Sequence, residues 1–117
     1  PRLNLGITYR HMEQPARALD ALRGAIGLDP GNAYVLYLSG CAAHELGLHT
    51  DAERFLKAAL AVKPDYTDPV ILLVDVLIEL EEPSQAIGVL EKFVGDHPKN
   101  AAARECLQRI RSSPLSG

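Results

Sequence analysis

The chain has 117 residues, a net charge of -3 and 47% hydrophobic residues, which is the size and composition of a single globular domain. Its acidic balance argues against a surface that binds nucleic acid. No apolar run approaches the roughly 20 residues needed to cross a bilayer, so we expect no membrane insertion.

A turn sequence recurs along the chain at a fixed period. The segments at 28–32, 62–66 and 96–100 place three prolines, Pro30, Pro64 and Pro98, 34 residues apart. A period between about 20 and 50 residues is typical of repeat arrays. Other positions align at the same period with the spacing of a helical stripe: Ala18, Ala52 and Ala86; Leu22, Leu56 and Leu90; Ala25, Ala59 and Phe93; Ile26, Leu60 and Val94.

Each unit also carries an earlier stripe, so each is expected to contain two helices. The expected helices span residues 2–12, 16–28, 33–46, 51–62, 69–81, 85–95 and 101–111. The turns between the two helices of a unit are only about three residues long. The paired helices are therefore expected to lie side by side and antiparallel. Pro15 and Pro83 suit first helical turns, Thr50 to Glu53 matches a capping box, and Ser84 is a second cap candidate.

The period divides the chain into units 1–31, 32–65 and 66–99. Residues 100–111 read as a helix with one apolar side, which is typical of a terminal cap, and residues 112–117 as a flexible tail or linker. The chain begins with Pro1 inside an expected helix, so we interpret it as a segment of a longer protein preceded by more repeats or another domain. A targeting signal is therefore unreadable, with the cytoplasm the favoured compartment.

These positions resemble the tetratricopeptide repeat family, whose signature is W-x2-L-G-x2-Y, then A-x3-F, then P. The matching residues in the three units are Leu5, Gly6, Tyr9, Ala18, Leu22 and Pro30; Leu36, Gly40, Ala43, Ala52, Leu56 and Pro64; and Val70, Leu73, Leu77, Ala86, Leu90 and Pro98. Arg2, Ser39 and Val74 depart from the signature. The resemblance implies an all-α, right-handed α-α superhelix of three helix-turn-helix repeats plus a C-terminal capping helix, whose first helices line a concave partner-binding face.

Signals of catalysis are absent from the sequence. No H-E-x-x-H, P-loop, G-x-S-x-G or G-x-G-x-x-G motif occurs. Cys41, His44 and Asp75 are in phase to form a cluster, but it lacks the three or four converging ligands that zinc requires. We therefore expect no enzyme activity, metal or cofactor, and no disulfide between Cys41 and Cys106, which lie nearly two units apart.

Removing the packed stripe from each first helix leaves the positions expected to line the concave groove. These are Asn4, Ile7 and Arg10 in unit one; Tyr34, Tyr37, Leu38, Cys41 and His44 in unit two; and Asp68, Ile71, Leu72, Asp75 and Glu79 in unit three. The apolar members are expected to form an exposed patch suited to a peptide or helix of another protein. The alternatives are that they pack on upstream repeats, on a second copy of the chain, or on their own neighbours.

The third unit is the acidic part of the array. Residues 66–99 carry a net charge of -5, against +1 for residues 1–31. We therefore expect a partner with apolar anchors and basic residues, whereas Asp68 and Asp75 disfavour the C-terminal carboxylates that some members of this family bind. The function expected is a protein-interaction scaffold. The alternatives are a self-association module, giving a homo-oligomer, and a regulatory or substrate-docking domain of a larger enzyme.

Overall fold

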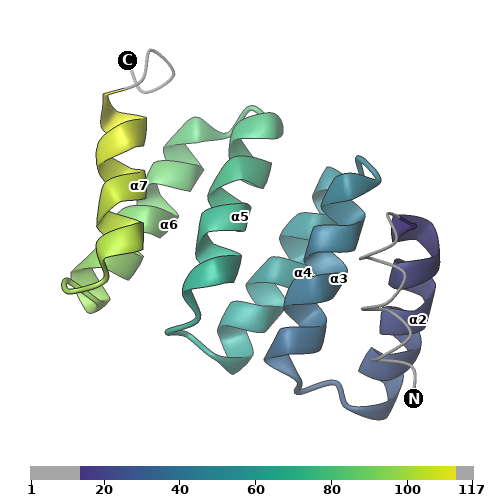
Figure 1. Ribbon diagram of the computed structural model, residues 1–117. Helices are drawn as coiled ribbons and strands as arrows, with labels where there is room; N and C mark the ends of the chain where they lie inside the picture. Colours follow the sequence, from purple (N-terminus) through teal and green to yellow (C-terminus); the bar gives the residue numbers. More distant parts are fainter. Residues whose placement is uncertain (1–13, 113–117) are drawn as a thin grey trace.

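The computed structural model describes residues 14–112, whose regular structure is entirely α-helical (Figure 1). The helices are α2 (Pro15–Leu28), α3 (Ala33–Glu45), α4 (His49–Val62), α5 (Thr67–Glu79), α6 (Pro83–Asp96) and α7 (Ala101–Arg111). Their bounds lie within two residues of those expected from the sequence. Helix α5 begins two residues before Pro69. A proline is tolerated there because the N–H groups of the first helical turn have no hydrogen-bond partner within the helix, so the missing N–H costs nothing. The helix expected at 2–12 lies outside the described residues. None of the described helices is long and apolar enough to cross a membrane.

The helices form an elongated stack of 43 × 25 × 20 Å with two unequal sides (Figure 1). Each helix packs against the next one in the chain, and α3 also contacts α5, which in turn contacts α7. Among residues 14–112, no Cα atom of α2, α4 or α6 lies within 8 Å of a Cα atom in another of these three helices. The first helices of successive units are thus closer together than the second helices. The surface formed by α3, α5 and α7 is the inner side of the curve.

The turns between units repeat in atomic detail. Each second helix ends two residues before a proline, as the period predicts, because the residue before proline avoids the helical region. The residue that follows each helix donates its backbone N–H to the carbonyl four residues earlier: Asp29 to Ala25 (2.9 Å), Lys63 to Ala59 (2.9 Å) and His97 to Phe93 (2.8 Å). Identical turns impose the same path on successive units, which is the basis of a regular solenoid.

Asparagine side chains cap two of the first helices. Asn32 Oδ1 accepts a hydrogen bond from the backbone N–H of Val35 at 3.1 Å, and Asn100 Oδ1 accepts one from Ala103 at 3.0 Å. Asn100 also donates through Nδ2 to the hydroxyl of Thr67, at 2.6 Å, and so ties the start of α7 to the start of α5. These contacts satisfy N–H groups that the helix itself leaves unpaired.

The caps expected at Thr50 and Ser84 are wrong. Helices α4 and α6 begin earlier than predicted, so both hydroxyls lie inside a first helical turn. Leu48 and Glu82 occupy the N-cap positions, and neither makes a side-chain capping bond. Proline at the first position of α6 agrees with the sequence, since its fixed φ favours helix initiation.

The turn within the third unit contains a left-handed residue that is not glycine. Gly47 has φ 76°, and Glu81, one period later, has φ 62°. A side chain in this region is strained, so Glu81→Gly should raise the free energy of unfolding by about 0.5–1 kcal/mol. Chemical denaturation would measure this change in the free energy of unfolding. Glu82→Gly, with the same charge change at φ -121°, is the matched control and should give no increase. Equal effects of the two changes would contradict the strain.

The predicted stripe forms the core. Ala18, Ala52 and Ala86 and, four residues later, Leu22, Leu56 and Leu90 are all completely buried. Small residues let the paired helices approach. A Cβ placed on Gly40 of α3 would lie 2.8 Å from Leu56 Cγ and Cδ2, and 3.6 Å from the carbonyl oxygen of Ala52. The helix pair therefore approaches closely at this glycine, with Leu56 as the nearest neighbour.

Candidate partner-binding groove

An open pocket of about 310 Å³ lies between α3 and α5 on the inner side of the stack. Its lining residues are Tyr37, Cys41, His44, Glu45, Asp68, Ile71, Leu72 and Asp75. All but Glu45 belong to the set expected from the sequence. We refer to this pocket as the groove. The remaining predicted residues lie beyond its lining, and Asn4, Ile7 and Arg10 lie outside the described residues.

The expectation that Leu38 is exposed is wrong. Leu38 retains 5% exposure and packs in a cluster with Leu19 and Leu22 of α2, whereas Tyr34, one turn earlier, is 46% exposed. Helix α3 sits between α2, α4 and α5, so only a narrow strip of its surface remains free. The apolar patch is consequently smaller than predicted, and Ile71 and Leu72 are partly buried rather than fully exposed.

Aromatic rings form one end of the groove. The Tyr37 and Tyr66 rings are 5.5 Å apart and tilted by 57°, and Lys63 Nζ lies 5.1 Å from the Tyr66 ring centroid. Burial, and then the charge and hydrogen bond of Cys41, raise the pKa of the Tyr37 hydroxyl well above its usual range. Burial also raises the pKa of Tyr66. Both hydroxyls therefore remain protonated at neutral pH and present neutral donors.

The acidic side of the groove holds an electrostatically unfavourable carboxylate. Asp75 is exposed on α5, yet desolvation by the surrounding protein raises its pKa, with a further increase from Glu79. Arg109 of α7 and His44 of α3 act in the opposite direction. A carboxylate that is disfavoured in the free protein gains more from a cation delivered by a partner.

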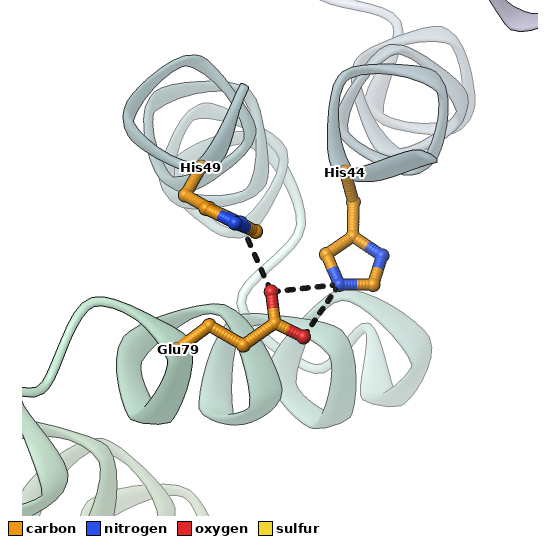
Figure 2. Close-up of polar contacts among 3 residues, drawn as sticks. All are labelled: His44, His49 and Glu79. Carbon is orange, nitrogen blue, oxygen red and sulfur yellow. Dashed lines mark hydrogen bonds and ion pairs between the residues drawn. The ribbon is translucent and has the colours of Figure 1, made fainter. Parts of the chain in front are cut away.

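Three side chains from consecutive helices meet beside the groove (Figure 2). His44 Nε2 is 3.1 and 3.2 Å from the two carboxylate oxygens of Glu79, and His49 Nδ1 is 2.9 Å from Glu79 Oε2. The imidazole rings have centroids 6.0 Å apart. His44 and Glu79 were expected at the groove. His49 was not, because it lies on a second helix.

Arg109 and Glu45 were also missing from the expected set. Glu45 follows His44 at the end of α3, and Arg109 lies on the capping helix, which was treated as a cover for the core rather than as part of the inner surface. Contact between α5 and α7 brings Arg109 toward Asp75. The sequence signal for Arg109 is its place on the polar side of an amphipathic helix that continues the row of first helices.

Comparison with known proteins identifies the repeat. Two family models, both described as tetratricopeptide repeat, match residues 3–67 and 43–110. No curated protein matches the sequence. Each family model covers more than half of the chain, so the assignment does not depend on a single unit.

Solved structures give the same result. The crystal structure of MamA has a TM-score of 0.84 and 26% identity over 95% of this chain and 65% of MamA; a second MamA structure is covered to 61%. The first TPR domain of Spaghetti (RPAP3), bound to the HSP90 peptide SRMEEVD, has a TM-score of 0.82 and 22% sequence identity. The match covers 99% of this chain and 94% of that domain. YrrB, described as a TPR protein with an unusual peptide-binding site, has a TM-score of 0.77 and 23% sequence identity. The match covers 95% of this chain and 57% of YrrB. The chain spans about two thirds of the MamA structures, and it belongs to the tetratricopeptide repeat family.

Proposed function

We propose that the chain is a protein-interaction scaffold that binds a peptide or helix of a partner in the groove between α3 and α5. The observation that carries this proposal is the pocket itself, which gathers Tyr37, Ile71 and Leu72 beside the carboxylates Asp68 and Asp75 on the inner side of the array. Peptide complexes of neighbours with this fold support the same use of the surface.

The chemistry of the groove favours a basic partner with apolar anchors. Four acidic side chains, Glu45, Asp68, Asp75 and Glu79, lie in or beside it. The peptide SRMEEVD bound by the RPAP3 domain ends in acidic residues, and such a sequence would meet like charges here. A partner with Lys or Arg flanking an aliphatic or aromatic residue is complementary instead. The half-buried rings of Tyr37 and Tyr66 offer aromatic contacts for that residue.

A self-associated form of the chain and a role as a docking domain of a larger enzyme are the alternatives. Tetratricopeptide repeats are generally interaction modules without catalytic activity, and we propose that this chain has none of its own. Self-association would occupy the groove with a second copy. Sedimentation across a concentration range therefore accompanies the binding test. A dimer that forms in the absence of any enriched peptide, and that Asp75→Lys disrupts, would replace the peptide proposal with self-association.

The test is selection from a random peptide library, followed by affinity measurement with the enriched peptides. We expect enriched sequences to be basic with one apolar anchor. Asp75→Lys should weaken their binding about tenfold or more, and binding to the unchanged chain should weaken as salt rises. Asp96→Lys is the matched control, because Asp96 lines a different pocket between α4 and α6.

The Asp96→Lys control separates the loss of a charge in the groove from the change in net charge of the whole chain. Both variants change the net charge equally, so only contact with the groove distinguishes them. Equal losses, binding that is insensitive to salt, or enrichment of acidic peptides would each contradict the proposal.

A further inference from the structure

The side chains in Figure 2 come from three helices that belong to two units. His44 is in the last turn of α3, His49 is the first residue of α4, and Glu79 is the last residue of α5. Their ligand atoms all lie within 4.8 Å of one another. The side chains are 29, 35 and 40% exposed, so the cluster is reached from solvent without being fully immersed in it.

We propose that His44, His49 and Glu79 form a binding site for a divalent transition-metal ion of the zinc class, with a fourth coordination position open to solvent. Two imidazoles and one carboxylate are ligand types that zinc accepts in sites with three protein ligands. The proposal departs from the expectation of no metal drawn from the sequence. The site shares His44 with the lining of the groove, but the argument for it does not rest on peptide binding.

The spacing of the three groups fits such an ion. Ligand atoms about 2.0–2.2 Å from a tetrahedral ion are separated from each other by about 3.3 Å. The observed nitrogen-to-oxygen distances are 2.9–3.2 Å. The two imidazole nitrogens are bounded only by the 4.8 Å separation, so closing the site around an ion requires them to approach each other by up to about 1.5 Å through rotation of the exposed His rotamers.

The orientation of His49 is a second, independent observation. Its Nδ1 is inaccessible to solvent and has no hydrogen-bond partner among the described residues, although Glu79 Oε2 lies 2.9 Å away. The short distance without a hydrogen bond means that the nitrogen is not aligned with the oxygen. This buried nitrogen is left without a partner, and an ion held among the three groups would supply one. His44 Nε2, by contrast, is within hydrogen-bonding distance of both carboxylate oxygens.

The repeat supplies a variant that removes one ligand with little risk to the fold. His49 occupies the first position of α4, and the equivalent residues of α2 and α6 are Pro15 and Pro83. Leu48, the residue before His49, has a backbone ψ angle of 71°. The residues before the two prolines have similar angles, 72° at Gln14 and 58° at Glu82. His49→Pro therefore restores the local pattern of the array while deleting the imidazole.

The experiment is calorimetric titration of the untagged chain with Zn²⁺, joined by absorption spectroscopy with Co²⁺. We expect one ion per chain, and visible bands of tetrahedral Co²⁺ without a thiolate charge-transfer band. His49→Pro and Glu79→Gln should each weaken binding about tenfold or more, because only two ligands remain. His97→Gln removes a histidine that packs on Phe93, outside the cluster, and should leave the affinity unchanged.

Three results would overturn the site. They are the absence of one-to-one binding, unchanged affinity in both His49→Pro and Glu79→Gln, and a thiolate band that disappears in Cys41→Ala. The last would assign the ion to Cys41 instead. Circular dichroism of each variant verifies that a loss of binding reflects the missing ligand and not loss of the helices.

Discussion

Replacing Leu56 by Ala is expected to lower the free energy of unfolding by about 2–5 kcal/mol, the usual range for a buried leucine. Leu56 is completely buried in α4 and belongs to the larger core cluster, where Leu73 and Leu77 of α5 are also buried. Its loss leaves a cavity at the junction between the second and third units. Small neighbours such as Ala52 have few atoms with which to fill it.

Urea denaturation followed by far-ultraviolet circular dichroism measures this loss. Leu28→Ala is the matched control, because Leu28 at the end of α2 is 80% exposed and the same deletion there should change stability by less than about 0.5 kcal/mol. Similar effects at the two positions would mean that Leu56 is not in the core.

Gly40→Ala is expected to destabilise the chain by about 1–3 kcal/mol, although alanine favours a helix by about 1 kcal/mol. The added Cβ would lie 2.8 Å from two carbons of Leu56, which is completely buried. Gly88 of α6 is the matched control. It is helical and exposed, with nothing within 4 Å of a Cβ, so Gly88→Ala should stabilise the chain by about 0.5–1 kcal/mol.

The two substitutions at this contact should not be additive. In a chain that already carries Leu56→Ala, the clash is gone and the new methyl group fills part of the cavity. Gly40→Ala should then become neutral or stabilising, which a double-mutant cycle measures as a favourable coupling energy. Additive losses would show that Gly40 matters for some reason other than its approach to Leu56.

The fold was largely predictable because its information is local and repeated. The 34-residue spacing of Pro30, Pro64 and Pro98 predicted where the second helices end and how the chain divides into units. Helix starts were predicted less well, since Thr50 and Ser84 have the chemistry of caps but the chain enters α4 and α6 before reaching them. The asparagines that do cap, Asn32 and Asn100, lie one residue before helices whose starts were placed correctly.

The groove was predictable only where helix phase decides exposure. Phase identified most of the pocket lining, including Tyr37, Asp68 and Asp75. It misplaced Leu38, because burial there depends on α2 packing against the same side of α3. His49 and Arg109 depend on contacts between units, which a single helix does not encode. A signal for His49 was nevertheless available, since it interrupts the prolines found at the same position of the other units.

Unequal packing on the two sides of the array determines how it bends. The backbones of α3 and α5, and of α5 and α7, approach each other directly, whereas within residues 14–112 the backbones of α2, α4 and α6 do not. We infer that the outer layer resists bending less than the inner layer. Changes in curvature therefore alter the outer spacing first and leave the distance between α3 and α5 nearly constant. A force applied along the array would change its pitch while the groove kept its width.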